Sequence, residues 1–343
     1  MDKYIKTICD EIYSTQDFKS FNNKTVLVTG VNGLIGGMIS EFFYYLKTKK
    51  GYNIKLILTS KSETANRLKH LNNTFFEYYS IDLSKNDISD FISKQKINYC
   101  FYSSGYATPS SFIDKPLETL NININGLYNT LNFIKNNNED AKFLYISSGE
   151  IYSSNNNYFL HDEVNQITVD MSNKRNFYKI GKIAGELLIN NFRNTGFNAS
   201  SIRTTICYGP GNINDNRMLV DLVRKGLTED KIQLMDDGSS TRKLIHISDF
   251  CSMIFNIIKE GKNDVYNISG EEELSIFQIG EIISNYISKP VIKGHEINNI
   301  TKYASATNSM SLRRYEEEFG NHSFKSIEDG IKEFIDWYKN EMI

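Results

Sequence analysis

The sequence predicts an α/β protein with a doubly wound parallel sheet, followed by a smaller mixed α/β lobe at the C-terminal end. Strand-like and helix-like segments alternate up to Tyr208. The strand-like segments are almost continuously apolar, which is typical of strands buried on both faces of a parallel sheet. Past Tyr208 the segments become shorter and the alternation loosens, which indicates a second, smaller lobe.

Each element is predicted from its own pattern. Residues 1–18 predict a short amphipathic helix ahead of the first strand. Apolar or β-branched runs predict strands over 25–30, 53–60, 75–83, 97–105, 141–152 and 198–209. Apolar residues three to four apart predict helices over 34–49, 62–71, 87–95, 116–136 and 177–196.

In the second part we expect a loop and helix over 209–227, short strands over 243–250 and 264–270, and helices over 275–287 and 326–343. Three units follow: an N-terminal helical extension (1–24), a dinucleotide-binding unit (25–207), and a substrate-binding lobe (208–343) interleaved with the end of the second unit.

Gly30, Gly33 and Gly36 follow the first strand at a spacing of three. Glycine lets the backbone approach a diphosphate closely, and the start of a helix offers free N–H groups and the positive end of a dipole. The spacing is GxxGxxG rather than GxGxxG, and a tight turn with close helix packing is the alternative. Its place between strand and helix favours a Rossmann-type dinucleotide site.

Other strand ends fit the same ligand. Asp82 follows the third strand, where its carboxylate suits an adenine amino group, although a turn or capping residue is the alternative. The second strand ends at Ser60 and Lys61 instead of the acid that would hold a ribose 2′-hydroxyl. These residues favour NADP over NAD, unless they form only a solvated turn.

Tyr178 and Lys182 lie four apart on one helical face. A nearby ammonium favours the phenolate, so we expect the tyrosine to take a proton from a substrate hydroxyl near neutral pH. Ser147 and Ser148 end the preceding strand, where a hydroxyl could bind the same substrate oxygen. Taken alone, the pair would favour a half-buried aromatic beside a surface lysine.

Several motifs follow one another along the chain: the glycine turn, Asp82, the serines after two strands, YxxxK and the segment 238–249. In this order they make the sequence similar to the extended short-chain dehydrogenase/reductases. These are NAD(P)-dependent nucleotide-sugar epimerases, dehydratases and decarboxylases. The resemblance runs from about Thr25 to the C-terminus. It implies a tightly bound NAD(P), a nucleoside-diphosphate sugar as substrate and a homodimer built on the helix of Tyr178 and the long helix before it.

The resemblance also implies roles for individual residues. Ser148, Tyr178 and Lys182 would form the catalytic set, with Tyr178 as base at the sugar C4 hydroxyl. Asn123 matches a structural asparagine, and His246 belongs to the same segment as Arg242. The predicted cofactor-binding residues are Gly30, Gly33, Leu34, Ile35, Gly36, Ser60, Lys61, Asp82, Leu83, Ser104, Tyr178 and Lys182. The predicted substrate-binding residues are Thr108, Ser148, Arg217 and Arg242, unless Arg242 only pairs with Asp249.

Glu150 bears on the reaction that follows oxidation at C4. The new ketone acidifies the C5 proton, and relatives that are 4,6-dehydratases or uronate decarboxylases carry a glutamate here. If the strand continues past Ser148, alternation points Glu150 to the same side. We therefore predict C4 oxidation followed by loss of water or by decarboxylation. The alternatives are a 4-epimerase, a C4 dehydrogenase or ketosugar reductase with net redox, and a non-catalytic dinucleotide sensor.

Composition excludes some other functions. The net charge is -2, and no apolar run approaches the roughly 20 residues of a membrane span. We expect neither a nucleic-acid nor a membrane partner. The four cysteines lack metal-ligand spacing and fit buried apolar positions, so we predict no metal site and a cytoplasmic location.

Overall fold

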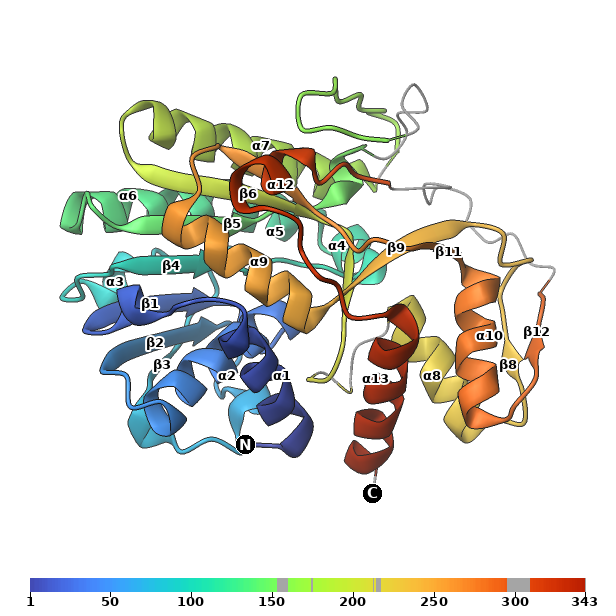
Figure 1. Ribbon diagram of the computed structural model, residues 1–343. Coiled ribbons are helices and arrows are strands. Elements are labelled where there is room, and N and C mark those ends of the chain that lie inside the picture. The colour runs from blue at the N-terminus through green and yellow to red at the C-terminus, as the bar shows by residue number, and fades with distance from the viewer. Residues whose placement is uncertain (153–159, 174, 212, 214–216, 295–308, 343) are drawn as a thin grey trace.

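The computed structural model describes residues 1–152, 160–173, 175–211, 213, 217–294 and 309–342. Its centre is a seven-stranded sheet with the order β10-β6-β5-β4-β1-β2-β3, and every neighbouring pair is parallel (Figure 1). The strands are β1 (Lys24–Thr29), β2 (Ile54–Ser60), β3 (Glu77–Ser80), β4 (Tyr99–Tyr102), β5 (Lys142–Ile146), β6 (Asn198–Thr204) and β10 (Val265–Ile268). The strand order reverses between β1 and β4, where such sheets open a crevice for a ligand.

Helices cover both faces of this sheet, as the doubly wound prediction requires. One face carries α1 (Lys3–Ser14), α2 (Leu34–Lys49) and α9 (Ile247–Glu260). The other carries α3 (Ser89–Ile92), α5 (Pro116–Asn121), α6 (Leu127–Asn137) and α7 (Asn176–Asn194). Along β1, Val26 and Val28 point to the first face and Leu27 to the second, so the strand is apolar throughout.

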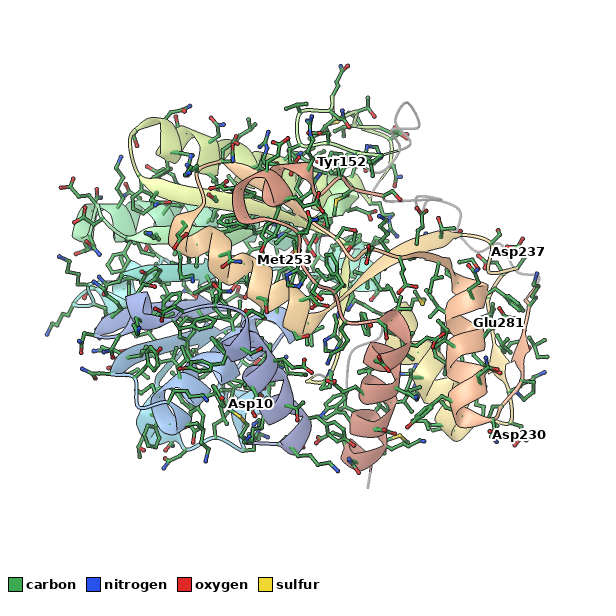
Figure 2. All side chains as sticks on the ribbon, in the orientation of Figure 1. Asp10, Tyr152, Asp230, Asp237, Met253 and Glu281 are labelled. Atoms are coloured by element: carbon green, nitrogen blue, oxygen red, sulfur yellow. The ribbon has the colours of Figure 1, made fainter. Side chains whose placement is uncertain are left out.

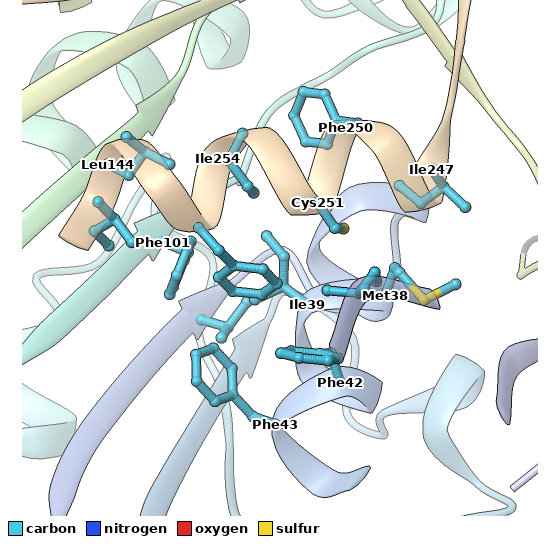
Figure 3. Close-up of a cluster of buried hydrophobic side chains, with 14 of the residues drawn as sticks. Met38, Ile39, Phe42, Phe43, Phe101, Leu144, Ile247, Phe250, Cys251 and Ile254 are labelled. Carbon is cyan, nitrogen blue, oxygen red and sulfur yellow. The ribbon is translucent and has the colours of Figure 1, made fainter. Parts of the chain in front are cut away.

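The core on the first face is rich in aromatic rings. Figure 3 shows Met38, Ile39 and Phe42 of α2 packed toward Cys251 and Ile254 of α9. The apolar stripe of α1 adds Ile5, Ile8, Cys9 and Ile12 to this core. All four cysteines are buried and free of disulfides. No helix in the described part of the chain is long and apolar enough to cross a membrane.

The smaller lobe holds a three-stranded sheet, β11-β9-β7, and a two-stranded one, β12-β8 (Figure 1). Its strands are β7 (Ile206–Tyr208), β8 (Ile232–Gln233), β9 (Thr241–His246), β11 (Glu273–Ser275) and β12 (Val291–Ile292), and its helices are α8 (Met218–Thr228), α10 (Ile276–Ile287) and α13 (Ile327–Glu341). In Figure 2, Asp230, Asp237 and Glu281 mark this lobe, whereas Asp10 and Met253 belong to helices on the large sheet. Two further helices are α4 (Pro109–Asp114) and α12 (Arg313–Phe319), which packs on β10.

The lobe and the large sheet are interleaved in sequence. The chain after Tyr208 forms the lobe, yet it returns to the large sheet with α9 and β10. Strand β7 pairs with β9 of the lobe although two of its three residues precede Tyr208.

Five predicted elements differ from the structure. The helix expected over 62–71 is only a 3₁₀ turn, Asn66–Leu68, because the Arg67 side chain turns inward to bind the carbonyls of Gly33 and Leu34. The helix expected over 116–136 contains a π-helical turn at Ile122–Gly126. There Gly126 passes so close to the Leu83 carbonyl that an added Cβ would lie 2.3 Å from it.

The other three differences lie at strand ends. The strand expected over 141–152 ends at Ile146, and Gly149–Tyr152 is a 3₁₀ turn. The strand expected over 198–209 divides into β6 and β7, which join different sheets. Beyond His246 the strand expected over 243–250 gives way to α9, a helix that the sequence patterns did not predict.

Candidate active site

The turn between β1 and α2 forms the cradle expected for a diphosphate. Gly30 has a φ of +70°, and an added Cβ there would lie 2.8 Å from the Ser103 carbonyl oxygen. At Gly36 an added Cβ would lie 2.6 Å from the Gly30 carbonyl oxygen. Gly33 caps α2, whose first-turn N–H groups, including those of Leu34 and Ile35, have no carbonyl within the helix to bind. These residues fit the diphosphate of a dinucleotide.

The segment that follows β4, the strand beside β1 in the sheet, packs against this turn. The backbone N–H groups of Ser103 and Ser104 both donate to Thr29 Oγ1, at 3.2 Å each. Ser104 is itself buried, directly after β4. The cradle therefore depends on β1, α2 and β4 together, at the point where the strand order reverses.

The residues predicted for the adenosine end gather at the tips of β2 and β3. Ser60 is buried, and its Oγ accepts from Asn32 Nδ2 at 3.0 Å and lies 2.7 Å from Tyr78 Oη. Lys61 is exposed, with its Nζ 4.6 Å from the ring centroid of Tyr106.

Asp82 and Leu83 follow β3. Asp82 Oδ1 accepts from the N–H and the hydroxyl of Ser84, which is the turn role left open above. Leu83 is buried, and its backbone carbonyl faces Gly126.

Ser148, Tyr178 and Lys182 come together as the motif predicts. The Ser148 hydroxyl hydrogen-bonds Tyr178. Lys182 Nζ donates to the Ile146 carbonyl at 2.7 Å and lies 5.7 Å from the ring centroid of Tyr178. Phe112 of α4 stacks on the tyrosine, with ring centroids 4.8 Å apart. The phenol is thereby held beside a hydroxyl and an ammonium.

The electrostatics of the pair differ from the simplest expectation. Burial raises the pKa of Tyr178 to about 12, and the Ser148 hydrogen bond opposes that rise only in part. Burial also lowers the pKa of Lys182 to about 7, against the opposing effect of Glu186. The prediction of a phenolate near neutral pH is therefore wrong for the protein alone, because removal from water disfavours both charged forms.

A buried polar network supports the catalytic helix from behind. Glu186, one turn after Lys182 on α7, accepts from the Ser147 hydroxyl at 2.5 Å and pairs with Arg203 of β6 at 2.7 Å. Arg203 also donates to Tyr152 Oη at 2.6 Å. Asn123, in the π-helical turn, is fully buried and accepts from Tyr145 Oη at 2.7 Å.

Glu150 lies beside Ser148, as expected, but not for the expected reason. The expectation relied on strand alternation past Ser148, and this does not apply because β5 ends at Ile146. Instead the 3₁₀ turn brings the Glu150 N–H to Ser148 Oγ at 3.1 Å. The Glu150 carboxylate is ion-paired with Arg175 at 3.1 Å.

The residues predicted for substrate approach this centre from three elements. Thr108 caps α4, and its hydroxyl donates to Ser111 Oγ at 2.6 Å. Arg217 precedes α8 and lines a pocket with Leu34 and Tyr208, and its charge favours ionisation of Tyr178. Arg242 of β9 lies in the field of Glu150, which opposes the lowering of its pKa by burial.

Asp249, the alternative partner predicted for Arg242, is bound by other residues. The Asp249 carboxylate accepts from the backbone N–H of Lys325 at 3.1 Å and lies 3.1 Å from His322 Nε2.

Sequence reasoning missed Arg175, Lys179, Phe112 and Tyr106. Arg175 lies three residues before Tyr178, one helical turn away, and this spacing could have indicated it. Lys179 is buried, and burial lowers its pKa to about 8 while Glu150 opposes the shift. Phe112 and Tyr106 follow β4 in a segment without a motif, so the sequence carried no signal for them.

The model of the NAD dependent epimerase/dehydratase family matches residues 26–269, and the chain belongs to that family. The match spans both the glycine turn and the Tyr178–Lys182 pair. It confirms the family that the motifs suggested, and with it the prediction that the chain is an NAD-dependent enzyme.

The two relatives named here are distant but extend over most of the chain. A dTDP-4-dehydro-6-deoxy-D-allose reductase of a Streptomyces species is 24% identical over 328 residues, 92% of this chain and 96% of that protein. The UDP-glucose 4-epimerase of Mycoplasma genitalium is 23% identical, over 92% of this chain and 96% of that protein.

Solved structures share the fold. A dTDP-glucose 4,6-dehydratase of Streptomyces venezuelae, with NAD bound, aligns with a TM-score of 0.79 at 18% identity, over 92% of this chain and 97% of that one. The UDP-glucose 4-epimerase of Thermotoga maritima aligns with a TM-score of 0.78 at 19% identity, over 93% of this chain and 100% of that one. The Rossmann-type fold predicted from the sequence is confirmed.

Proposed function

We propose that the protein binds a nucleoside-diphosphate sugar, oxidises it at C4 and then removes the C5 proton, so that water is eliminated as in a 4,6-dehydratase. One observation carries this proposal. The Ser148–Tyr178 hydrogen bond beside Lys182 stands next to a carboxylate, Glu150, whose charge is balanced by Arg175. The relatives named above act on nucleotide sugars, which supports the substrate class.

The roles follow from position. A bound nicotinamide dinucleotide would supply the hydride acceptor for C4. The phenolate form of Tyr178 takes the proton of the C4 hydroxyl and becomes a neutral phenol, and Ser148 holds the same oxygen. Lys182 supplies a positive charge that favours this phenolate before the proton is transferred. The carbonyl left at C4 makes the C5 proton acidic enough for a carboxylate to remove.

The ion pair favours elimination of water over decarboxylation. A 4-keto uronate loses CO₂ when the C5–C6 electrons pass toward the C4 carbonyl, and no base at C5 is needed. Elimination breaks C5–H and C6–O, forms a C5–C6 double bond and releases water. The hydride taken from C4 would return to C6 and a proton to C5, so that the net change is the loss of one water. The elimination needs a base at C5, and the Glu150 carboxylate paired with Arg175 would supply it.

A second function is a 4-ketosugar reductase with net consumption of reduced cofactor. The reductases among the relatives favour it, because they align over nearly their full length. It would use Ser148, Tyr178 and Lys182 in the reverse direction and leave Glu150 without a chemical step.

Product analysis on a defined panel tests both functions. We would incubate the purified protein with dTDP-glucose, UDP-glucose, GDP-mannose and UDP-glucuronate, and analyse the products by mass spectrometry. Loss of one water supports the proposal, and loss of CO₂ identifies a decarboxylase. An isomer of unchanged mass identifies an epimerase. Turnover of none of the four sugars, combined with reduction of 4-ketosugars by NADPH or NADH, would replace the proposal with the reductase.

We propose NADP as the dinucleotide. Lys61 is an exposed cation at the tip of β2, where a carboxylate would repel a 2′-phosphate. Mass spectrometry of the nucleotides released on denaturation tests this, and recovery of NAD alone would contradict it.

We also propose a cytoplasmic homodimer that buries the outer surface of α5, α6 and α7. Leu117, Tyr128 and Leu187 are 67%, 46% and 68% exposed on these helices. The lobe formed by residues 208–343 would supply most contacts to the nucleotide sugar, since Arg217 and Arg242 come from it.

A further inference from the structure

The Arg175–Glu150 pair is fixed from two sides. Arg175 Nε and Nη2 both reach Glu150 Oε1, at 3.3 and 3.1 Å, and the two side chains are 13% and 22% exposed. The guanidinium also lies 5.6 Å from the ring centroid of Phe112, the ring that stacks on Tyr178. The Phe112 ring therefore contacts both Arg175 and the tyrosine proposed as catalytic.

Glu150 faces charges from two elements besides its own turn. The segment leading into α7 and the helix itself contribute Arg175, Tyr178 and Lys179, and β9 contributes Arg242. Arg175 forms an ion pair with Glu150, at 3.1 Å. Lys179 and Arg242 also interact electrostatically with Glu150.

The geometry also orients the carboxylate. Both Arg175 donors bind Oε1, so the arginine holds one oxygen and leaves Oε2 without a bond from it. A carboxylate anchored through one oxygen keeps the lone pairs of the other available to a proton. Charge-assisted bonds of this kind fix orientation more firmly than neutral ones.

We propose that Arg175 is a positioning residue that holds the Glu150 carboxylate through Oε1 and directs its Oε2 toward the C5 hydrogen of the 4-ketosugar. This rests on the proposed function, in which Glu150 is the base. In the step, the C5–H bond breaks, the proton passes to Oε2, and the electron pair forms the C4–C5 enolate. Arg175 touches neither the proton nor the sugar.

Deuterium exchange at C5 measures this step apart from oxidation. We would follow deuterium incorporation from D₂O into whichever of dTDP-glucose, UDP-glucose, GDP-mannose and UDP-glucuronate the holoenzyme turns over, and record C4 oxidation as cofactor reduction in a single turnover. The variants are Arg175→Gln, Arg175→Lys and Glu150→Gln. Lys55→Gln is the control, because it removes the cation of an ion pair with Glu77 at the other end of β2 from Ser60.

We expect Arg175→Gln to slow C5 exchange at pH 7 about 10- to 100-fold, while C4 oxidation stays within about 3-fold of the wild type. Without the two bonds to Oε1 the carboxylate is no longer held toward C5, whereas C4 oxidation does not use it. Arg175→Lys should recover part of the exchange rate, and Lys55→Gln should change neither rate.

The outcomes separate the two proposals. If Glu150→Gln retains C5 exchange, the proposed function fails whatever Arg175 does. If Glu150→Gln abolishes exchange but Arg175→Gln leaves the exchange rate unchanged, the role of Arg175 is refuted and the proposed function stands. An equal loss of C4 oxidation and exchange in Arg175→Gln, without recovery in Arg175→Lys, would show a structural role and also refute the proposal.

A second measurement does not depend on turnover. In holoenzyme labelled with ¹³C at the glutamate carboxyls, the resonance lost in Glu150→Gln identifies Glu150. Its chemical shift at one fixed pH should change in Arg175→Gln, because the two hydrogen bonds to Oε1 are lost. An unchanged chemical shift would contradict the proposal even if no sugar of the panel reacts.

Discussion

Tyr178 holds its proton tightly, because burial outweighs the Ser148 hydrogen bond. Its hydroxyl nevertheless is the group aligned with Ser148 and Lys182, so chemistry at C4 should depend on that single oxygen. We predict that Tyr178→Phe lowers kcat by about 100-fold or more while dinucleotide binding stays within about 3-fold. Single-turnover cofactor reduction and a binding titration measure the two quantities.

Tyr79→Phe is the matched control, since this hydroxyl bonds Glu77 on β3. It should keep full activity. Turnover that survives in Tyr178→Phe would show that another group takes the C4 hydroxyl proton.

The burial of Lys182 should reduce the free energy of unfolding near neutral pH. Its folded pKa, about 7, is below the usual lysine value, so between these values the unfolded chain binds more protons. Stability therefore rises with pH over this window and is lost as pH falls toward 7. We predict that Lys182→Met is more stable than the wild type at pH 7, by on the order of 3 kcal/mol.

The stability difference between Lys182→Met and the wild type should narrow as pH approaches 10. Thermal unfolding at pH 7, 8.5 and 10 checks the sign, and a destabilised Lys182→Met at pH 7 would contradict it. The variant should be inactive in every case, a trade of activity for stability.

Substitutions at Gly30, in the turn from β1 to α2, and at Gly51 would measure how closely the backbone approaches its neighbours. Gly30 and Gly51 both have a positive φ, near 70°, but only Gly30 has a neighbour within contact distance of an added Cβ. We predict that Gly51→Ala costs about 1 kcal/mol from backbone strain alone. Gly30→Ala should cost about 3 kcal/mol and abolish dinucleotide binding, because Ser103 blocks the new methyl group.

Urea unfolding and a dinucleotide titration measure these effects. Equal costs for the two substitutions would mean that the contact between Gly30 and Ser103 is looser than the structure has it.

The elements that local patterns misjudged share one cause. Residues 62–71 carry helical spacing, yet Arg67 gains more by binding the first turn of α2. Residues 198–209 carry one strand pattern, yet Thr205 marks the change from the large sheet to the lobe. In both cases a tertiary partner overrides a local preference, which carries little free energy.

At the level of the whole molecule, exposed apolar side chains on α5 and α7 predict the assembly. Leu117 and Leu187 are two-thirds exposed, which is unusual for leucines on long packed helices. We predict that Leu187→Asp converts the homodimer to a monomer in sedimentation without unfolding it. Val164→Asp, at an exposed apolar residue elsewhere, should leave the mass unchanged. A wild-type protein that sediments as a monomer at all concentrations would refute the dimer.

The fold and half of the site could be predicted from the sequence, because their signals are local. The strand, the glycine turn and α2 are adjacent in the chain, and Tyr178 and Lys182 are one helical turn apart. Spacing alone therefore indicated them, and the family match confirms the class of protein that they define.

The pairing of Glu150 with Arg175 was decided only in three dimensions. The two residues are 25 positions apart, and their contact depends on a 3₁₀ turn after β5 and on the way the chain enters α7. The same holds for Phe112 against Tyr178 and for Arg242 near Glu150, since α4 and β9 arrive from other parts of the chain. Periodicity records which face a residue takes on its own element, whereas the charge beside a catalytic group depends on how separate elements pack.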